Sequence, residues 1–393
     1  MKKALIVLLL LAFVVGSVFA QEGLTFSARV MAGLGFWKVG DNDAGWGLMT
    51  PSGTTRGMRW NFIANYKNAD GTKGVYTYLR SRGSGAGNRT FNSMSTSNGF
   101  HILYAEGWFT AFDGLLKVQG GKMTDSPFGY GDWWGVADPI DAAYGLAATI
   151  NATDAIKFGF GATSANGIDR MLAFGGDHSD PDPSKHINGV NLYGGFAGDF
   201  GAVSANAYFE GRKEDVNAHA AVTIKLDGLK IGLPVYIFDI SNFGDTNEVL
   251  ILPYVNFTGI DKLTVDFFLN IGFKNNDATA GNWDDEMGEC KDPAFGGMLG
   301  VSYSFGNIIP RLAIAYMSGA TYCGVSYGLK ECIWDFNSYD KGDAYLMIRP
   351  QVRTRTSASS YVDFGFVLTS QLGDNKPDNA LSFGAFIDFS VSF

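Results

Sequence analysis

Acidic and aromatic side chains gather in one stretch of the sequence, residues 123–141, which reads MTDSPFGYGDWWGVADPID. The stretch contains four aspartates and no lysine or arginine. Arginines recur elsewhere, on the polar positions of segments in which apolar and polar residues alternate. Fixed acids that face fixed arginines across a watery passage create a transverse electric field, which orients dipolar solutes and sets ion preference. This is the chemistry that the residue types favour.

The residues of this candidate arrangement form two sets. The stretch 123–141 contributes Asp125, Tyr130, Asp132, Trp133, Trp134, Asp138 and Asp141. The basic set, assigned from the alternation, is Arg29, Arg59, Arg80, Arg82, Lys117, Arg349, Arg353 and Arg355. If the arginines outnumber the acids at the narrowest point, a weak anion preference follows. A shift of one residue in register would move each side chain to the opposite face, and the acidic stretch could instead stay outside as turn-capping aspartates.

The aromatic residues allow a second interpretation. Trp133, Trp134 and Tyr130 share the acidic stretch, and Tyr76 and Tyr78 lie on the polar face of residues 74–82. Flat aromatic rings in a pore could stack on sugar rings. The alternative is that these side chains pack the stretch against a wall.

Catalytic and metal-binding patterns are weak in this chain. It has four histidines, and we find no convincing Gly-x-Ser-x-Gly elbow of a serine hydrolase. His219 falls on the polar face of residues 216–226 and is predicted to be solvated. Acidic runs at residues 41–43, 177–182 and 284–286 could bind Ca²⁺ through oxygen ligands, although none matches an EF-hand and solvated acids are the alternative. We therefore expect no enzyme activity and no cofactor.

The three cysteines, Cys290, Cys323 and Cys332, all fall in predicted long loops. In an oxidising compartment Cys323 and Cys332 can close a small loop, which is the pairing we favour. Free thiols, or a bridge from Cys290 to either of the others, stay open as alternatives.

The elements that must position these residues are strands. A two-residue alternation runs through residues 24–36, 57–67, 263–274, 346–355 and 361–368, and again through residues 381–393. Short turns and mostly long polar connections alternate along the chain, which indicates antiparallel hairpins with tight turns at one rim. Counting the segments gives about 18 strands of roughly ten residues, the length that a tilted membrane strand needs.

We therefore predict an all-β fold: a transmembrane, antiparallel, up-and-down β-barrel of about 16–18 strands. A secreted β-sandwich or propeller would also alternate, but a propeller predicts a repeat of ~40–50 residues, which we do not find. Aromatic residues near strand ends fit the girdles of a membrane barrel. The apolar face of residues 381–393 would then face lipid, and this strand would close the barrel against the first.

Residues 1–20 have the pattern of a secretory signal peptide, because Lys2 and Lys3 precede an apolar run and cleavage is expected after Ala20. The alternative is an uncleaved membrane helix. Residues 21–393 are predicted to form a single domain, since no linker or change of composition divides them. Hydrophobic residues make up 46% of the chain and 52 residues are glycine, as in large β proteins. The net charge of -9 argues against nucleic acid as a partner.

Two features of the sequence resemble bacterial outer-membrane porins. Phe389, Val391 and Phe393 match the terminal aromatic strand that the barrel assembly machinery reads in that family. The segment 104–129, YAEGWFTAFDGLLKVQGGKMTDSPFG, is similar to the porin stretch that precedes and enters the constriction loop after the fifth strand. The resemblance implies an outer-membrane porin of the general-diffusion type, a water-filled channel for small hydrophilic solutes and ions. It also implies that residues 123–141 fold inward as a constriction loop whose acids face the basic wall.

The expected partners are outer-membrane lipid, the barrel assembly machinery and small hydrophilic solutes. A homotrimer is a further expectation, since Ala28, Ala32, Gly194 and Gly198 form small faces that would permit a subunit contact. Two alternatives stay open. A sugar-selective porin would use the aromatic residues as a track, whereas a surface adhesin or receptor would use the long loops and keep the barrel as an anchor.

Overall fold

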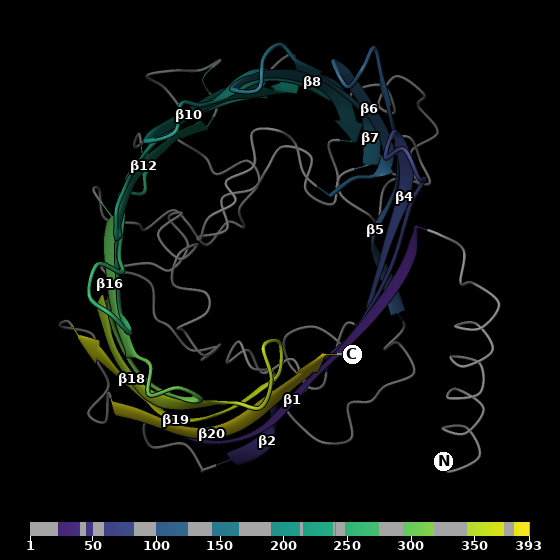
Figure 1. Cartoon of the computed structure of the whole chain (residues 1–393). Helices are drawn as coiled ribbons and strands as arrows, with labels where there is room; N and C mark the ends of the chain where they lie inside the picture. Colours follow the sequence, from purple (N-terminus) through teal and green to yellow (C-terminus); the bar gives the residue numbers. More distant parts are fainter. Residues whose placement is uncertain are drawn as a thin grey trace, which may run out of the picture.

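The computed structural model of the chain describes residues 23–39, 45–49, 59–81, 100–124, 144–164, 190–212, 215–238, 240, 248–274, 294–317, 344–372 and 381–392. In this part of the chain twenty strand segments form one antiparallel sheet that curls into a ring (Figure 1). Their bounds are β1 (Leu24–Val39), β2 (Gly45–Met49), β3 (Arg59–Lys67), β4 (Lys73–Ser81), β5 (Phe100–Ala111), β6 (Leu116–Lys122), β7 (Tyr144–Asn151), β8 (Ile156–Ser164), β9 (Val190–Asp199), β10 (Val203–Arg212), β11 (Asp215–Leu226), β12 (Leu229–Phe238), β13 (Glu248–Ile251), β14 (Tyr254–Phe257), β15 (Leu263–Lys274), β16 (Ala294–Tyr303), β17 (Ile308–Met317), β18 (Ala344–Arg355), β19 (Tyr361–Leu372) and β20 (Leu381–Ser392).

The described segments make eighteen positions in the wall. β2 and β3 share one position, because both pair with β1, at its two ends. β13 and β14 share another position between β12 and β15, interrupted at Leu252 and Pro253. The structure thus confirms the predicted all-β barrel, at the upper end of the predicted range. Among the described residues, no helix has the length and apolar character to cross a membrane.

The first and last strands close the ring. β1 and β20 pair antiparallel from Arg29 with Ser392 to Val39 with Ser382. The other edge of β1 pairs with β3, and the other edge of β20 pairs with β19. The predicted closure by the last strand is therefore confirmed, and a closed ring leaves no free edge to be satisfied in lipid.

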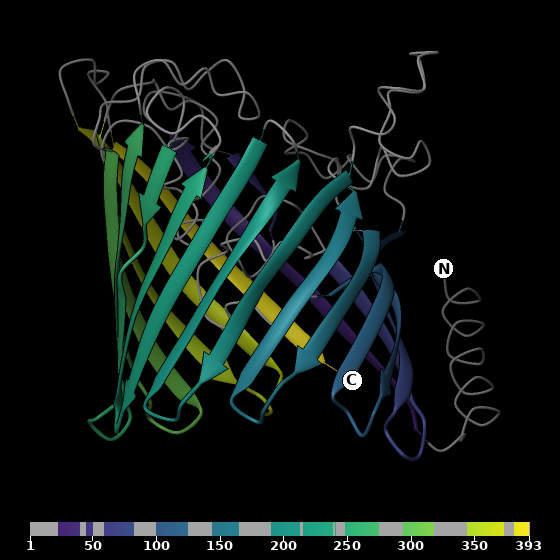
Figure 2. The same ribbon diagram turned by 90° about the horizontal axis from the view of Figure 1, so that it is seen from above.

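Tight turns join strands at one rim, which lies at the bottom of Figure 2. In the turn between β5 and β6, Phe112 and Asp113 have φ of 56° and 54°, and Gly114 has φ of 88°. The N–H of Leu115 donates to the Phe112 carbonyl at 3.0 Å. Left-handed backbone of this kind matches the twist of a hairpin and favours Gly and Asp.

The two faces of the wall differ as the alternation predicts. In β20, Leu381, Ile387 and Phe389 are exposed on the outer face, whereas Asp388 and Ser390, at the alternate positions, are buried on the inner face. The other strands repeat this division, with most of the large exposed apolar side chains at outer positions. An apolar outer band and a polar interior are the pattern of a membrane barrel.

Glycines on the inner face accommodate rings from the neighbouring strand. The four cross-strand pairs are Gly74 with Trp108, Gly161 with Tyr193, Gly232 with Tyr254 and Gly365 with Phe386. In each pair a Cβ added at the glycine would come within 2.9 Å of ring atoms. Each ring therefore lies over the glycine opposite it, which accounts for part of the high glycine content.

The wall is lowest where residues 123–143 begin. β6 has seven residues and β7 has eight, whereas β5 has twelve. β6 stops after Lys122 pairs with Ala105, so within the described part of the chain residues 100–104 of β5 pair only with β4. Because β2 and β3 share a position, β6 is the fifth strand of the wall, where the porin resemblance places the start of the constriction loop.

Candidate functional site

Four arginines from three strands form the main charged feature of the described inner face. Arg29 lies on β1, Arg311 on β17, and Arg349 and Arg353 on β18. These strands lie near one another because β17 pairs with β18, and β19 and β20 connect β18 to β1. We call this group the arginine strip.

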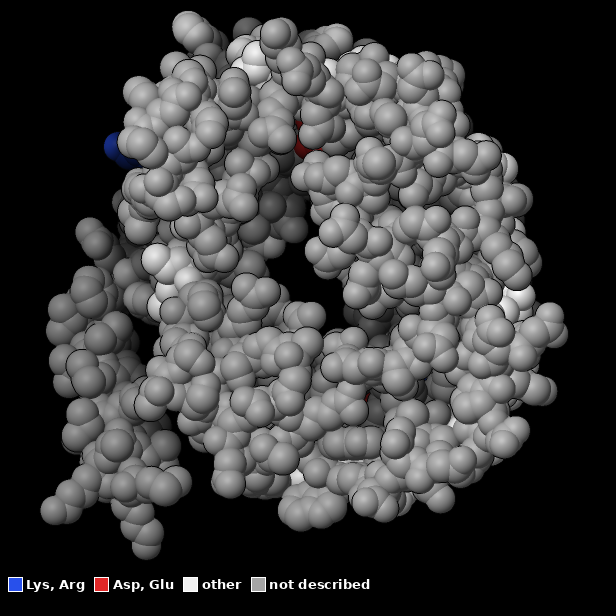
Figure 3. All heavy atoms as spheres, turned by 180° about the vertical axis from the view of Figure 1, so that it is seen from behind, with Lys and Arg blue, Asp and Glu red and all other residues white. Residues whose placement is uncertain are grey.

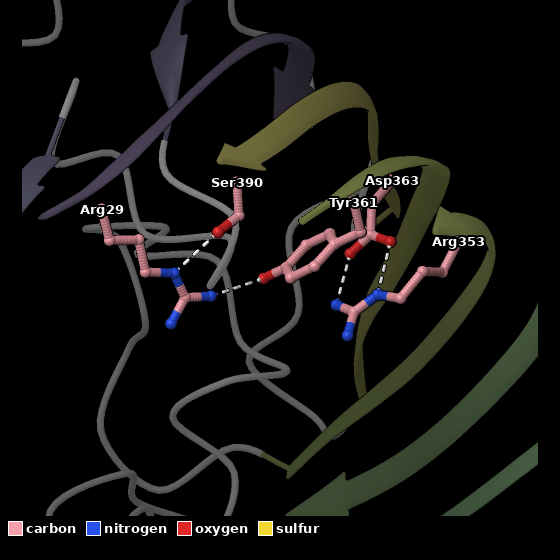
Figure 4. A network of polar contacts seen from close by, with 5 residues as sticks. All are labelled: Arg29, Arg353, Tyr361, Asp363 and Ser390. Atoms are coloured by element: carbon pink, nitrogen blue, oxygen red, sulfur yellow. Dashed lines mark hydrogen bonds and ion pairs between the residues drawn. The ribbon is translucent and has the colours of Figure 1, made fainter. Parts of the chain in front are cut away.

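One arginine of the strip is held by a bidentate ion pair (Figure 4). Arg353 Nε donates to Asp363 Oδ1 at 2.8 Å, and Nη2 donates to Oδ2 at 2.6 Å. The Asp363 side chain is 1% exposed and that of Arg353 is 20% exposed. A planar guanidinium paired in this way keeps a fixed orientation, so Arg353 is a rigid part of the wall.

Tyr361 joins Arg353 to Arg29. The Arg353 guanidinium carbon lies 3.7 Å from the Tyr361 ring centroid, a cation–π contact. The Tyr361 hydroxyl accepts a hydrogen bond from Arg29 Nη2 at 3.4 Å, and Arg29 Nε donates to Ser390 Oγ at 2.7 Å. Figure 4 shows the Tyr361 ring between the two guanidinium groups. The network ties β18, β19, β20 and β1 together across the seam of the barrel.

The remaining two arginines differ in burial, since Arg349 is buried and Arg311 is not. The guanidinium carbon of Arg349 lies 4.8 Å from the ring centroid of Phe386, the one large apolar residue on the inner face of β20. Arg311 is half-buried and makes no hydrogen bond within the described residues, and its electrostatic neighbours include Arg353, Asp363 and Arg349. Its five N–H donors are therefore available to an anion.

Two further acids accompany the strip. Asp266 on β15 accepts a hydrogen bond from the Asn256 side chain and lies within electrostatic reach of Arg311. Asp388 on β20 pairs in register with Asp363 on β19. The strip is thus a mixed field in which guanidinium groups outnumber the carboxylates among the residues described here.

The start of residues 123–143 is anchored on the inner side of the wall. Glu106 on β5 is buried, and its Oε2 accepts from the N–H of Thr124 at 2.9 Å while Oε1 accepts from Thr124 Oγ at 2.9 Å. Met123 is fully buried against Ala147 of β7, Tyr193 of β9 and Tyr208 of β10. These wall residues are inner-face residues, so the chain has turned into the barrel by Met123.

Lys122 supplies a hydrogen-bond donor to the wall where β6 ends. Its Nζ donates to the carbonyl of Ile102 at 2.7 Å and lies 5.3 Å from the ring centroid of Tyr144. Ile102 belongs to the part of β5 that has no pairing with β6. The lysine ammonium thus replaces part of the pairing that a longer β6 would supply.

His219 contradicts the prediction of a solvated residue. It is 4% exposed, and its ring lies 4.8 Å from that of Tyr208 and 4.3 Å from that of Tyr236. The prediction followed from the polar face of β11 alone. It failed because the neighbouring strands place tyrosines directly opposite His219 in register.

A second aromatic cluster lies on β4 and β5. The ring of Tyr104 lies 6.3 Å from that of Tyr76 and 5.7 Å from that of Tyr78. All three side chains are half-buried. They form a partly accessible aromatic face beside Glu106, which shares the inner face of β5.

Several residues expected from the sequence lie on the described inner face. They are Arg29, Lys117, Arg349, Arg353 and Arg355. Lys117 lies 5.9 Å from the ring centroid of Trp108, and Arg355 is exposed at the end of β18 near the turns. Arg59 and Arg80 belong to β3 and β4, but their side chains lie outside the description. Phe389 and Val391 lie on the outer face of β20.

Other expected residues lie outside the described residues altogether. They are Asp125, Tyr130, Asp132, Trp133, Trp134, Asp138, Asp141, Arg82, Phe393, Cys290, Cys323 and Cys332, together with the signal peptide and the acidic runs considered for Ca²⁺. Within the described ranges, no group of three or more histidine, cysteine or acidic side chains could hold a metal ion.

Sequence reasoning missed Arg311, Glu106 and the partners of the arginines. Arg311 lies on the inner face of β17, next to Pro310 on the outer face. Alternation in residues 308–317 could have found it. Predicting the Arg353–Asp363 pair requires the register between β18 and β19, which no local sequence pattern contains.

In Figure 3 the few red atoms of described acids lie inside the outline of the barrel.

No protein-family model matches the sequence, and no curated protein matches it either. Solved structures match in fold. Pseudomonas aeruginosa OccK3 (OpdO) has a TM-score of 0.54 at 9% identity, over 94% of this chain and 95% of that chain. The P. aeruginosa outer membrane protein OpdK gives 0.54 at 10%, over 94% and 99%. Acinetobacter baumannii OccAB4 gives 0.51 at 9%, over 95% and 100%. The class is therefore that of closed β-barrels of the outer-membrane channel fold, and identities this low extend no further than the fold.

Proposed function

We propose that the chain is an outer-membrane channel for the uptake of small hydrophilic solutes, and that small anions, carboxylates foremost, are its preferred solutes. The observation that carries this proposal is the contrast between the two faces of one closed wall. The outer face carries exposed apolar side chains, whereas the inner face carries the arginine strip. Guanidinium groups recognise carboxylates through paired N–H donors, and Arg311 has such donors to offer.

One of the structures with the same fold supports a carboxylate as the solute. One matched structure is that of OpdK with vanillate, at a TM-score of 0.52 and 10% identity over 94% of this chain and 98% of that chain. Vanillate is a carboxylate anion. For this chain the solute class is our proposal, which favours a substrate-selective channel over the general-diffusion porin expected from sequence.

The first test is conductance. Refolded protein inserted into a planar bilayer should give stable, stepwise, ohmic currents, and in a KCl gradient the reversal potential should have the sign of anion preference. Arg311→Gln and Arg349→Gln should each reduce that preference, because a guanidinium charge leaves the passage. Arg355→Gln is the matched control, since Arg355 lies on the same face but at the exposed rim.

A folded barrel that inserts into lipid without any current would overturn this function. The surface adhesin or receptor, which uses the barrel as an anchor, would then be the better account. Currents with cation preference in the wild type would retain the channel and reject the role of the arginine strip.

The tyrosine cluster favours a second candidate, a sugar-selective channel. Tyr76, Tyr78 and Tyr104 form a half-buried aromatic face on the inner wall, of the kind on which sugar rings stack. Addition of maltose or sucrose to the bilayer chamber would interrupt the current of such a channel. Tyr104→Ala should abolish this block, and currents unaffected by sugars would exclude the candidate.

The finer expectations stay predictions. They comprise the acidic constriction loop at residues 123–141, cleavage after Ala20, assembly through Phe389, Val391 and Phe393, the Cys323–Cys332 bridge and the homotrimer. The inward anchoring of Met123 and Thr124 supports the first of these.

A further inference from the structure

Two lysines and a tryptophan lie together on the inner wall near the tight turns, outside the arginine strip. Lys67 is the last residue of β3, Trp108 lies on β5, and Lys117 is the second residue of β6. The Trp108 ring centroid lies 6.0 Å from Lys67 Nζ and 5.9 Å from Lys117 Nζ. We call these three residues the lysine–tryptophan cluster. Two positive charges therefore lie beside one aromatic ring.

The register explains why these side chains meet. Lys67 pairs with Gly74 of β4, and Gly74 pairs with Trp108. Because Gly74 has no side chain, the Trp108 ring lies over it: an added Cβ would be 2.8 Å from Cζ2 and 2.9 Å from Cε2 of the ring. On the other side of Trp108, Lys117 pairs with Thr110, two residues along the same face of β5. The two lysines thus approach the ring from opposite sides.

The hydrogen-bond donors of this cluster have no acceptor among the described residues. Neither lysine ammonium forms an ion pair or donates a hydrogen bond to a described residue, and the indole N–H of Trp108 donates none either. Glu106 precedes Trp108 by two positions on the same face, but its two oxygens are occupied by Thr124. Lys67 is exposed, and Trp108 and Lys117 are half-buried, so the cluster is accessible from the passage.

This set of donors fits one class of anion. Above its second pKa of roughly 6 a phosphomonoester carries close to two negative charges, and it has three strong acceptor oxygens. Two ammonium groups offset both charges, and the indole N–H can donate to the remaining oxygen. Lysine side chains are flexible point charges, so they can converge on one phosphate from both sides of the ring. A single carboxylate would leave one ammonium without a counter-ion.

We propose that Lys67, Trp108 and Lys117 form a binding site for phosphomonoester dianions on the inner wall of the barrel. The site is separate from the arginine strip, since β19, β20, β1, β3 and β4 lie between β18 and β5 in the wall. A solute meets it close to the mouth that the tight turns surround. This inference rests on the proposed channel function and adds a second class of anionic solute.

The test compares two dianions, glycerol 3-phosphate and succinate, as blockers of the KCl current in a planar bilayer at about pH 8. Glycerol 3-phosphate should block the wild type in a saturable way. Lys67→Gln and Lys117→Gln should each raise its half-blocking concentration by about tenfold, the size of one lost hydrogen bond to a charged group, and leave that of succinate nearly unchanged. Trp108→Phe keeps a ring but removes the indole N–H, so its increase should be smaller.

Equal charge separates recognition from the general field of the wall. If the lysine variants weaken the block by both dianions alike, the lysines act through their charge alone and the proposal is overturned. Lys225→Gln is the matched control, because it removes the same charge near the same turns, on β11, where Lys225 pairs with Asp199. Its ratio of the two half-blocking concentrations should equal that of the wild type.

The matter is decided even if both lysine variants fail to fold, which a heat-shift of mobility on gels detects. Trp108→Phe then serves as the variant, and an unchanged ratio in it overturns the proposal. A conducting wild type that glycerol 3-phosphate does not block overturns this inference and leaves the channel function intact. A folded wild type that inserts into lipid without any current overturns the channel function instead.

Discussion

At the scale of single residues, the charges of the inner wall are set by cross-strand pairs. Arg353 is fixed by Asp363, Arg29 by Ser390 and Tyr361, and Arg349 rests on an aromatic ring. A charge held in this way sets a constant field along the wall.

Replacing Asp363 should show what the fixed pair contributes. Asp363→Asn removes the charge that holds Arg353 and leaves the guanidinium without its bidentate partner, so stability should fall by about 2 kcal/mol. Anion preference should rise, because one negative charge leaves the strip. Urea unfolding in lipid vesicles measures the first effect, and the reversal potential in a KCl gradient measures the second.

The exposed pair between Lys225 and Asp199 serves as the control for Asp363. Its side chains are 42% and 60% exposed, so Asp199→Asn should leave the unfolding midpoint nearly unchanged. An Asp363→Asn variant as stable as the wild type, with an unchanged reversal potential, would contradict the role given to the pair.

Glu106 offers a prediction about the segment that enters the barrel. Glu106→Gln keeps the size of the side chain but has one acceptor oxygen where the carboxylate offered two to Thr124. We expect noisier single-channel currents and altered conductance, because the start of residues 123–143 loses part of its anchor. The unfolding midpoint should change little, since the wall pairing stays.

Thr124→Ser is the matched variant for Glu106. It retains both the N–H and the hydroxyl that Glu106 accepts, so its currents should match those of the wild type. Quiet, unchanged currents in Glu106→Gln would show that the anchor has no influence on the passage.

At the scale of elements, the strands depend on glycines that face rings. Gly232 is the most confined, since an added Cβ would lie 2.1 Å from Cε1 of Tyr254. The same geometry recurs between β4 and β5, β8 and β9, and β19 and β20. Alternation predicts the strands themselves, but it does not predict which glycine faces which ring, because that requires the register.

Gly232→Ala should therefore destabilise the barrel by about 1–3 kcal/mol, the usual cost of forcing extra volume into a packed wall. Gly107→Ala is the control, because its nearest atom would be 3.9 Å away on the outer face. That variant should be neutral or slightly stabilising in a strand. Midpoints of urea unfolding in the same vesicles compare the two.

A loss of stability in Gly107→Ala equal to that in Gly232→Ala would assign the effect to strand backbone rather than to ring contact. A Gly232→Ala, Tyr254→Ala double variant tests the same point from the other side. It should recover part of the loss, since the ring that the methyl meets is gone.

At the scale of the whole molecule, the sequence predicted the barrel, the closure by residues 381–393 and the inner position of Arg29, Arg349 and Arg353. It could do so because a period of two is local and recurs in every strand. It did not predict the burial of His219 or the pairing of Arg353 with Asp363. Those depend on strands that are neighbours in space, so the candidate site was predictable only as a list of inner-face arginines.

The seam between β1 and β20 has a consequence for how the chain acquires its structure. The hydrogen bond from Arg29 to Ser390 joins residues 361 positions apart, and it lies in the pairing that completes the ring. Folding rates fall as such sequence separations grow, because the chain entropy of a long loop is lost before the contact forms. Until β1 and β20 pair, the incomplete sheet has two unpaired edge strands, and these can form backbone hydrogen bonds with other polypeptide chains. We therefore expect this chain to need escort proteins and a catalyst of insertion, whatever solute the finished ring admits.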